Sequence, residues 1–389
     1  MKSEWKIRSI SDIAEINPRE SIRRGTKAKK ITMDALQPFT RDVSSYQIKE
    51  FKGGTKFRNM DTIMARITPC LENGKTAQIR CLDDDEVGFG STEYIVFRAK
   101  ERIDSNYLYY LVCSPIVRDP AIKSMVGSSG RQRVQTDLVA NLQVSIPDYE
   151  EQVKIGELLK ALDDKIKLNN EINKNLEQQA QAIFANEFLS LETLPEGWKQ
   201  ASLIDIADYL NGLAMQKYRP TDGESGIPVL KIKELRQGCC NDNSELCSPN
   251  IKSNYIIHDG DVIFSWSGSL LVDLWCGGIC GLNQHLFKVT SSKYDKWFYY
   301  AWTNHHLQKF AAIAADMATT MGHIKREELS KAEVLIPSQS DYNRIGGLLS
   351  PLYDLVIANR IENRKLASLR DELLPQLMSG QLEVSEVSL

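Results

Sequence analysis

Basic, amide and hydroxyl side chains, which are well suited to hydrogen bonding, are concentrated in two short segments between residues 66 and 133. The first follows an apolar run and offers Arg66, Thr68, Asn73 and Lys75. The second contains two glycines, and its polar members are Ser128, Ser129, Arg131, Gln132 and Arg133. Arginine can form two hydrogen bonds with guanine, asparagine can do so with adenine, and glycine lets a backbone approach phosphate closely. Side chains of these types could therefore hydrogen-bond to base edges and phosphates.

The same side chains have structural alternatives. Arg66 could pair with a carboxylate, and Asn73-Gly74 is typical of a two-residue type I′ hairpin turn. For Asn73 the turn is the better interpretation. For residues 127–133, the two cations, the amide and the small hydroxyls on a glycine-containing loop favour contact with DNA.

Two long segments carry the same spacing of apolar residues and asparagines, displaced by 345 − 155 = 190 positions. The first set is Ile155, Leu159, Leu162, Ile166, Asn169, Asn173 and Leu176. The second set is Ile345, Leu349, Leu352, Val356, Asn359, Asn363 and Leu366. Alternating steps of four and three residues are typical of the seam of a coiled coil. The sequence therefore predicts two helices, over about 149–188 and 341–378, that pair through these seams.

The asparagines on the predicted seams have a specific physical meaning. A buried asparagine lowers stability but specifies register, because misaligned pairing leaves its amide without partners. If the helices pair antiparallel, the four asparagines meet near the middle. The alternative is that they are solvated positions on a loose helix. Pro351 is expected to kink the second helix or to mark the start of its regular part.

The repeat extends more weakly into the segments before each helix. Trp5-Lys6 matches Trp198-Lys199, and Asp61-Thr62-Ile63-Met64 matches Asp261-Val262-Ile263-Phe264. In the first copy we expect strands over 61–67, 76–81, 93–97 and 142–146, a helix capped by Ser9 or Ser11, and a helix over 107–112 capped by Ser105 or Asn106. The expected domains are 1–148, a helix over 149–190, a second domain over 191–340, and a helix with its tail over 341–389.

The second copy has its own polar candidates, which occupy the corresponding loops. They are Ser265, Trp266, Ser267, Ser269, Asn283, Gln284, His285, Thr320, His323 and Lys325. Residues 283–285 align with 91–93 and could place amides at a base edge. They could equally satisfy the backbone groups of a strand, which is the commoner role of buried polar residues.

Composition limits the class of protein. A chain of 389 residues with 42% hydrophobic and 25% charged residues is expected to form two globular domains without a membrane span. The eight cysteines follow no disulfide-scaffold pattern, which favours a reducing cytoplasm. The net charge of −3 does not indicate a nucleic-acid binder, but residues 1–149 hold 24 lysines and arginines against 19 acidic residues, a net charge of +5. If the chain binds DNA, the neutralisation of phosphates must be local or shared with other subunits.

Motifs for catalysis are missing from the sequence. No glycine-rich cofactor loop follows a strand, no Walker A run is present, and Asn17-Pro18-Arg19 does not match the catalytic tetrapeptide of an adenine methyltransferase. A zinc site that includes Cys276 and Cys280 is conceivable, but the irregular cysteine spacing favours free thiols. We therefore expect no cofactor, no metal and no catalytic residue.

The duplicated arrangement resembles the specificity subunit of type I restriction–modification systems, over essentially the whole chain. The strings that carry the resemblance are Asp61–Lys75, Gly90–Tyr94, Ile146-Pro147 leading into Glu151–Ile155, Leu194–Trp198 and Leu373–Gly380. Their order and duplication are more specific than any single string.

This resemblance implies a fold and a role. The fold would be α+β, with two similar target-recognition domains separated by a long antiparallel two-helix coiled coil and related by a pseudo-twofold axis. Each domain would recognise one half of a split, asymmetric site in double-stranded DNA. The helices would set the gap and bind two methyltransferase subunits, with restriction subunits joining the complex. Two alternatives remain: a fused restriction–methylation enzyme, and a bivalent adaptor that binds proteins through its coiled coil.

Overall fold

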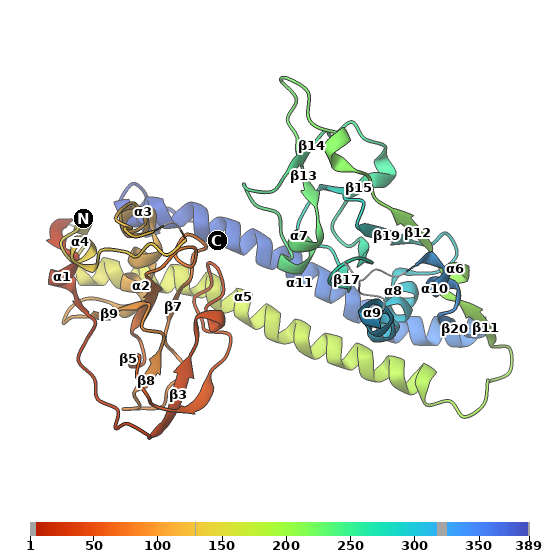
Figure 1. Ribbon diagram of the computed structural model, residues 1–389, viewed down its shortest axis with the longest axis horizontal. Coiled ribbons are helices and arrows are strands. Elements are labelled where there is room, and N and C mark those ends of the chain that lie inside the picture. The colour runs from red at the N-terminus through yellow and green to blue at the C-terminus, as the bar shows by residue number, and fades with distance from the viewer. Residues whose placement is uncertain (1–4, 129, 317–324, 388–389) are drawn as a thin grey trace. The chain divides into compact units, whose positions relative to one another are not determined.

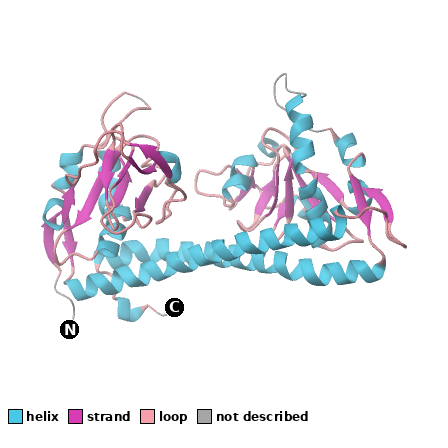
Figure 2. Cartoon of the chain, turned by 90° about the horizontal axis from the view of Figure 1, so that it is seen from below, coloured by secondary structure: helices cyan, strands magenta, loops and turns pink. Residues whose placement is uncertain are grey.

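The computed structural model describes residues 5–128, 130–316 and 325–387. The chain forms two compact units: unit 1 comprises Met1–Ile166 and Leu366–Leu389, and unit 2 comprises Lys167–Lys365. Each unit contains one globular part and a segment of each of two long helices, α5 (Tyr149–Phe184) and α11 (Gln339–Ser379). Figure 2 shows that the strands of each unit gather in its globular part.

Unit 1 is built from short strands. They are β1 (Lys6–Ser9), β2 (Ala14–Ile16), β3 (Lys27–Ile31), β4 (Gln47–Glu50), β5 (Thr55–Phe57), β6 (Thr62–Ala65), β7 (Thr76–Gln78), β8 (Gly88–Gly90), β9 (Tyr94–Ala99) and β10 (Gln143–Ile146). The shorter helices are α1 (Ile10–Ile13), α2 (Ser105–Cys113), α3 (Pro115–Lys123) and α4 (Thr136–Ala140). β1 pairs with β10, and the other strands form sheets in the orders β2-β9-β6-β7 and β4-β3-β8-β5.

Unit 2 is built in the same way. Its strands are β11 (Lys199–Ser202), β12 (Asp208–Asn211), β13 (Ile227–Leu230), β14 (Leu246–Cys247), β15 (Ile256–Ile257), β16 (Val262–Ser265), β17 (Leu271–Leu274), β18 (Cys280–Leu282), β19 (Leu286–Thr290) and β20 (Glu333–Ile336). Its shorter helices are α6 (Leu203–Ile206), α7 (Ile232–Gln237), α8 (Lys296–His305), α9 (Leu307–Asp316) and α10 (Arg326–Ser330). The sheets have the orders β11-β20, β12-β19-β16-β17 and β14-β13-β18-β15.

The two units share one strand arrangement. Adding ten to every strand number of unit 1 reproduces the sheets of unit 2, including the parallel pairs β3–β8 and β13–β18. Figure 1 labels β3, β5 and β8 in unit 1 and their counterparts β13 and β15 in unit 2. This confirms the expected α+β class with two similar domains. The twofold axis expected between the domains stays a prediction.

Within each unit, the segments of α5 and α11 run antiparallel. In unit 2, Asn359 donates a hydrogen bond to Asn173, and Asn169 donates to Asn363, so residue numbers rise along one helix as they fall along the other. In unit 1, Leu159 of α5 and Leu377 of α11 share one core. Helix α11 is continuous through Pro351, so the expectation that its regular part begins at this proline is wrong.

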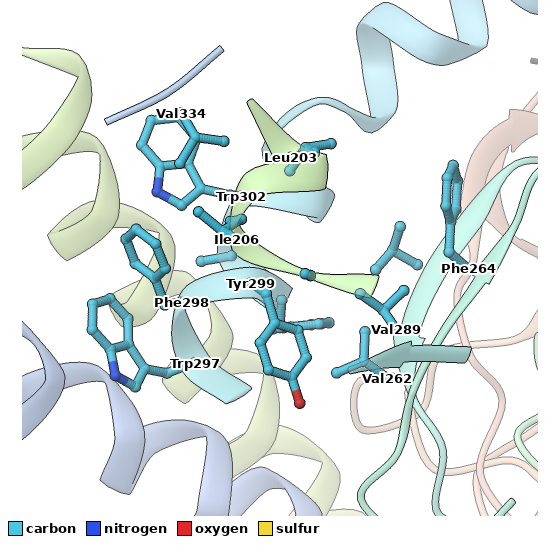
Figure 3. Packing of buried hydrophobic residues seen from close by; sticks show 14 of the residues in the cluster. Leu203, Ile206, Val262, Phe264, Val289, Trp297, Phe298, Tyr299, Trp302 and Val334 are labelled. Atoms are coloured by element: carbon cyan, nitrogen blue, oxygen red, sulfur yellow. The ribbon is translucent and has the colours of Figure 1, made fainter. Parts of the chain in front are cut away.

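The core of unit 2 shows how the globular part and the helices are joined. The aromatic residues of α8 are buried, because Trp297, Phe298 and Trp302 pack with Leu203 of α6 and Val334 of β20 (Figure 3). Ile345 and Leu349 of α11 belong to the same core. Burial of a large aromatic residue removes much apolar surface from water, so this core orients the sheets on the helix pair.

Local expectations for unit 1 are met in part. Ser9 caps α1 through a capping box with Asp12, as one of the two expected caps. Helix α2 begins two residues earlier than the apolar run indicates, and Asp104 caps it, so both expected caps are wrong. The sheet β4-β3-β8-β5 was not expected, because its strands are short and rich in lysine and glycine rather than in alternating apolar residues.

Candidate nucleic-acid interface

In unit 1, the two polar segments that the sequence singles out lie side by side. The amide of Thr68 donates to the carbonyl of Gln132 at 3.0 Å, and the amide of Gln132 donates to the Thr68 hydroxyl at 3.0 Å. The amide of Val134 donates to the carbonyl of Arg66 at 2.8 Å. The loop after β6 and residues 127–133 therefore form one surface, although about sixty positions separate them in the chain.

Glu93 anchors both arginines of this surface. Arg133 donates to its two carboxylate oxygens, at 2.7 and 3.0 Å, and the Nε of Arg66 lies 3.6 Å from it. The hydrogen bond from Arg133 lowers the pKa of Glu93. The structural alternative for Arg66, pairing with a carboxylate, is thus what the structure shows. Glu93 was not among the candidate residues, since nothing in its local sequence indicates that it meets residue 133.

Arg131 differs from its two neighbours. Its side chain is exposed and has no ion pair within the described part of the chain. Gly127 and Gly130 adopt φ values of +137° and +77°, which side chains rarely allow. A Cβ atom at Gly127 would lie 2.9 Å from the carbonyl oxygen of Arg131, so glycine permits the tight loop that presents this side chain. Ser128 is exposed beside it, and Ser129 lies outside the described residues.

The remaining candidates after β6 divide into one exposed and one internal residue. Asn73 is exposed, but its φ is not positive, and its amide donates to the Pro69 carbonyl at 3.0 Å. The expected type I′ hairpin is therefore wrong, because residues 66–75 form a longer loop between β6 and β7. Lys75 donates to the carbonyl of Met33 at 3.0 Å, so its ammonium group holds the backbone of the preceding segment.

Unit 2 places an aromatic residue where unit 1 has Arg66. The indole Nε1 of Trp266 donates to Asn211 at 3.1 Å, and its ring centroid lies 6.3 Å from that of His285 and 5.7 Å from that of Phe287. The flanking serines are buried, and Ser265 donates to the carbonyl of Ser267 at 3.2 Å. Ser269 is exposed on the same loop. Compared with the serines of this loop, Trp266 offers a larger side chain that combines an apolar ring with a polar indole nitrogen.

The aligned segment 283–285 has a mixed role. Asn283 is buried, and its side-chain oxygen accepts a hydrogen bond from the amide of His285 at 3.2 Å, so Asn283 follows the structural alternative. Gln284 and His285 are half-buried, and their side-chain nitrogens lie 3.4 Å apart. Lys325 is exposed and caps α10. Thr320 and His323 lie outside the described residues.

The seam positions are largely buried. Asn169, Asn173 and Asn359 are 0%, 5% and 9% exposed, so they are not solvated. Asn169 donates to Asn363 at 2.9 Å and to Glu362 at 2.7 Å. The apolar seam residues that are buried are Ile155, Leu159, Leu162, Leu176, Ile345, Leu349 and Val356, whereas Ile166, Leu352 and Leu366 are half-buried. These hydrogen bonds give the helix pair of unit 2 a defined register.

Arginine–carboxylate pairs lie where the long helices meet each globular part. In unit 1, Arg370 of α11 donates to Asp163 of α5 at 2.7 Å, and the Tyr110 hydroxyl of α2 donates to the same carboxylate at 2.6 Å. In unit 2, Arg364 of α11 donates to Asp259 at 2.7 Å, and this contact lowers the pKa of Asp259. The sequence pattern did not reveal these pairs, because their members are far apart in the chain.

The model of the family "Type I restriction modification DNA specificity domain" matches residues 2–178 and 195–370. The chain belongs to this family. The two matches cover the two globular parts and begin the second copy just before β11.

Relatives of this specificity-domain chain include two proteins that match it over most of their length. The MjaIX type I restriction enzyme specificity subunit of Methanocaldococcus jannaschii is 25% identical over 310 residues, 74% of this chain and 71% of that protein. The HindI specificity subunit of Haemophilus influenzae is 22% identical over an alignment of 463 positions, 98% of this chain and all of that protein. A crystal structure of a type I restriction–modification S subunit from M. genitalium has the same fold, with a TM-score of 0.56 and 12% identity over 96% of each chain.

Among the described residues, no group of three or more histidine, cysteine, aspartate or glutamate side chains could hold a metal ion. All eight cysteines are free thiols. Within the same ranges, no helix has the length and apolar character that a membrane span requires.

Proposed function

We propose that the chain is the DNA sequence-recognition subunit of a type I restriction–modification complex. Each globular part recognises one half of a bipartite, asymmetric site in double-stranded DNA. The observation that carries this proposal is one strand arrangement occurring twice in a single chain with unlike side chains at equivalent loops. Arg66, Glu93 and Arg133 stand in unit 1, and Trp266 and His285 in unit 2. Two copies of one strand arrangement that carry different hydrogen-bonding groups on equivalent loops suit the recognition of two different half-sites.

The contacting residues are proposed from the same geometry. In unit 1, Arg131 and Gln132, with the exposed Asn73 and Ser128, form the surface that faces the base edges. Arg133 holds the loop through Glu93 and acts as a positioning residue. In unit 2, the equivalent surface is formed by Trp266, Ser269, Gln284, His285 and Lys325. Mixed amide, hydroxyl and cationic groups of this kind can recognise both bases and phosphates.

The helices have a separate role in this proposal. They set the gap between the half-sites and bind two methyltransferase subunits, and restriction subunits join the larger complex. The chain itself is non-catalytic, since methyl transfer and cleavage belong to these partners. The target-recognition domains are residues 1–148 and 191–340, with helical domains over 149–190 and 341–389. Such a complex acts in the cytoplasm, where the DNA and a reducing environment are found.

Selection from a random duplex pool, with the partner methyltransferase present, tests the proposal. We expect the retained duplexes to share two short sequences at a fixed gap. A single contiguous sequence would contradict the two-domain assignment, and retention without sequence preference would favour a protein-binding adaptor. In parallel, the isolated chain is incubated with a labelled methyl donor and the selected duplex. Methyl transfer without partners would show that the chain is an enzyme.

A further inference from the structure

One face of the sheet β4-β3-β8-β5 in unit 1 carries lysines around a hollow. Lys30 of β3 lies beside Phe89 of β8, and Lys49 of β4 pairs with Ala28, two positions from Lys30 on the same face. Together with Lys52 of the loop that follows β4, these residues line a surface depression whose floor is the buried Phe89. Glu50 is the one acidic residue among the described residues that line it.

These three ammonium groups are not used to hold the fold. Neither Lys30, Lys49 nor Lys52 forms an ion pair within residues 5–128 or with the rest of the described chain. Lys29, on the opposite face of β3, is committed differently, because its Nζ lies 2.9 Å from Asp83 and 2.8 Å from Glu86. Three lysines outnumber the single carboxylate of Glu50 in this depression, so an anion placed there would be stabilised by the excess of positive charge.

A glycine turn borders the same depression. Gly53 and Gly54 adopt φ values of +147° and +125°, conformations that side chains rarely allow. A Cβ atom at Gly54 would lie 2.2 Å from the carbonyl oxygen of Gly90, so the turn requires glycine to approach β8. At Gly53 the equivalent position is open space. The backbone at Gly53 is therefore uncovered, and a phosphate can approach it closely.

The glycine turn also borders a second, open groove that reaches the candidate interface. Gly54 of the turn lines this groove, and so do Arg66 and Thr92, the latter next to Glu93 in the chain. Arg19 and Lys56 line it as well. The acidic residue of the groove, Glu20, is already neutralised, because Arg58 and Arg98 bind its carboxylate at 2.7 and 2.8 Å. The groove therefore links the two surfaces without an uncompensated negative charge.

Unit 2 lacks this basic surface at the equivalent place. The strand registers align Lys30 with Val229, Lys49 with Cys247 and Lys56 with Ile256. Val229 and Cys247 are fully buried, in a small core with Met215 and Ile251. The same sheet face is covered by apolar residues in unit 2 and carries unpaired lysines in unit 1. The apolar packing on this sheet face in unit 2 therefore does not explain the lysines of unit 1.

We propose that Lys30, Lys49 and Lys52 bind phosphates of the DNA backbone immediately outside the half-site that unit 1 recognises. This proposal rests on the proposed function and deepens it. It adds to unit 1 a sequence-independent contact with DNA that unit 2 lacks. Phosphate contacts fix the orientation of a protein on the duplex and carry no base information. The footprint on DNA is therefore expected to extend beyond the base pairs of the unit 1 half-site.

The test compares two charge-removing double variants in the complete complex with its methyltransferase partners. Lys30→Gln with Lys49→Gln, the anchor variant, removes two of the three lysines. Arg8→Gln with Lys27→Gln is the matched control, because both residues are exposed in unit 1 and Lys27 lies on the opposite face of β3. Affinity for the selected duplex and for a scrambled duplex is measured over a range of salt concentrations, and the footprint is mapped by hydroxyl radicals.

We expect the anchor variant to bind more weakly and to lower the slope of log affinity against log salt by about 1.8, roughly 0.9 for each lost phosphate contact. The ratio of affinities for selected and scrambled duplex should stay unchanged, and protection should shorten only beyond the unit 1 half-site. The control should resemble the wild type. An unchanged slope and footprint, or a collapsed affinity ratio, would overturn the anchor. If the wild-type complex showed no sequence preference, that result would instead contradict the proposed function itself.

Discussion

The loop after β6 in unit 1 and the loop after β16 in unit 2 occupy the same place in one strand arrangement, yet their chemistry differs in kind. In unit 1 a carboxylate, Glu93, joins two arginines, whereas in unit 2 the aligned His285 lies beside the ring of Trp266. The strands repeat because their side chains are buried and pair in a fixed register. Loop side chains add little to folding, so the recognition surface can differ while the support stays the same.

The long helices offer the strongest test of this separation between support and recognition. Seven residues are inserted into α5 after Ile166 and seven into α11 after Lys365, at the division between the units. Each insertion lengthens its helix by about 10 Å, close to the rise of three base pairs. We expect selection with this variant to return the same two half-sites with a longer gap, and binding to the original site to be lost.

Inserting seven residues into both helices keeps their heptad seams in phase. The same insertion into one helix alone therefore serves as the control. Seven residues inserted into α5 alone should place Asn169 and Asn173 out of register with their partners and lower stability. If the double insertion kept the original gap, the helices would not set the spacing. If it changed the half-site sequences themselves, support and recognition would not be separable.

The second comparison concerns how deeply the ion pair near the long helices is buried in each unit. Asp163 and Arg370 of unit 1 are 6% and 10% exposed, whereas Asp259 and Arg364 of unit 2 are 26% and 33% exposed. Removing one partner of a buried pair costs about 3–5 kcal/mol where it leaves an uncompensated charge, but a partly exposed pair contributes about 1 kcal/mol or less. Arg370 also pairs with Asp371 at 2.7 Å, so part of its charge stays compensated without Asp163. Asp163→Asn should therefore destabilise unit 1 more than Asp259→Asn destabilises unit 2.

Chemical denaturation followed by tryptophan fluorescence and hydrogen exchange measures this difference for each unit. The core of unit 2 contains Trp297 and Trp302, which report its unfolding separately. Equal losses for the two variants would contradict the comparison and would show that burial of the pair does not decide its contribution.

The contrast between local and distant contacts explains what could be predicted from the sequence. The seam residues, including Asn169 and Asn359, follow from spacing alone, because helix periodicity is a local property. Residues 127–133 were identified as a loop from their glycines. The partners of these loops could not be predicted, since Glu93 meets Arg133 across 40 positions and Asp163 meets Arg370 across 207. The lysine-bearing sheet escaped prediction because its short strands lack an alternating apolar pattern.

Arg131 and Arg133 sharpen the comparison within unit 1, because one is exposed and the other is held by Glu93. We expect Arg131→Ala to weaken binding to the selected site by about 1–3 kcal/mol and to relax the preference at one base of the first half-site. Arg133→Ala should weaken binding less and without a change at a single base, since it loosens the loop. Selection with each variant measures this, and Trp266→Ala provides the matched change in unit 2. If Arg131→Ala relaxed the preference at a base of the second half-site instead, the assignment of unit 1 to the first half-site would be wrong.

The smallest expected effect comes from the charge of Glu93, which has no acidic counterpart in unit 2. Its folded-state pKa is lowered below the ordinary value of 4.5, chiefly by the hydrogen bond from Arg133. A lowered pKa stabilises the folded state above pH 4.5, and this contribution disappears as the pH falls through the folded-state value. Because Arg133 is 43% exposed, the contribution is about 1 kcal/mol or less.

Glu93→Gln should therefore destabilise unit 1 slightly at pH 7 and less at pH 3, because the contribution of the lowered pKa is lost progressively as the pH falls below 4.5. Urea denaturation of wild type and variant at both pH values measures the difference, and the unfolding of unit 2 serves as the control because His285 replaces the carboxylate there. A destabilisation that persisted unchanged at pH 3 would show that the shape of the side chain, rather than its charge, holds Arg66 and Arg133. The two loops would then differ in packing, and the contrast between an ionic and an aromatic recognition surface would lose its electrostatic basis.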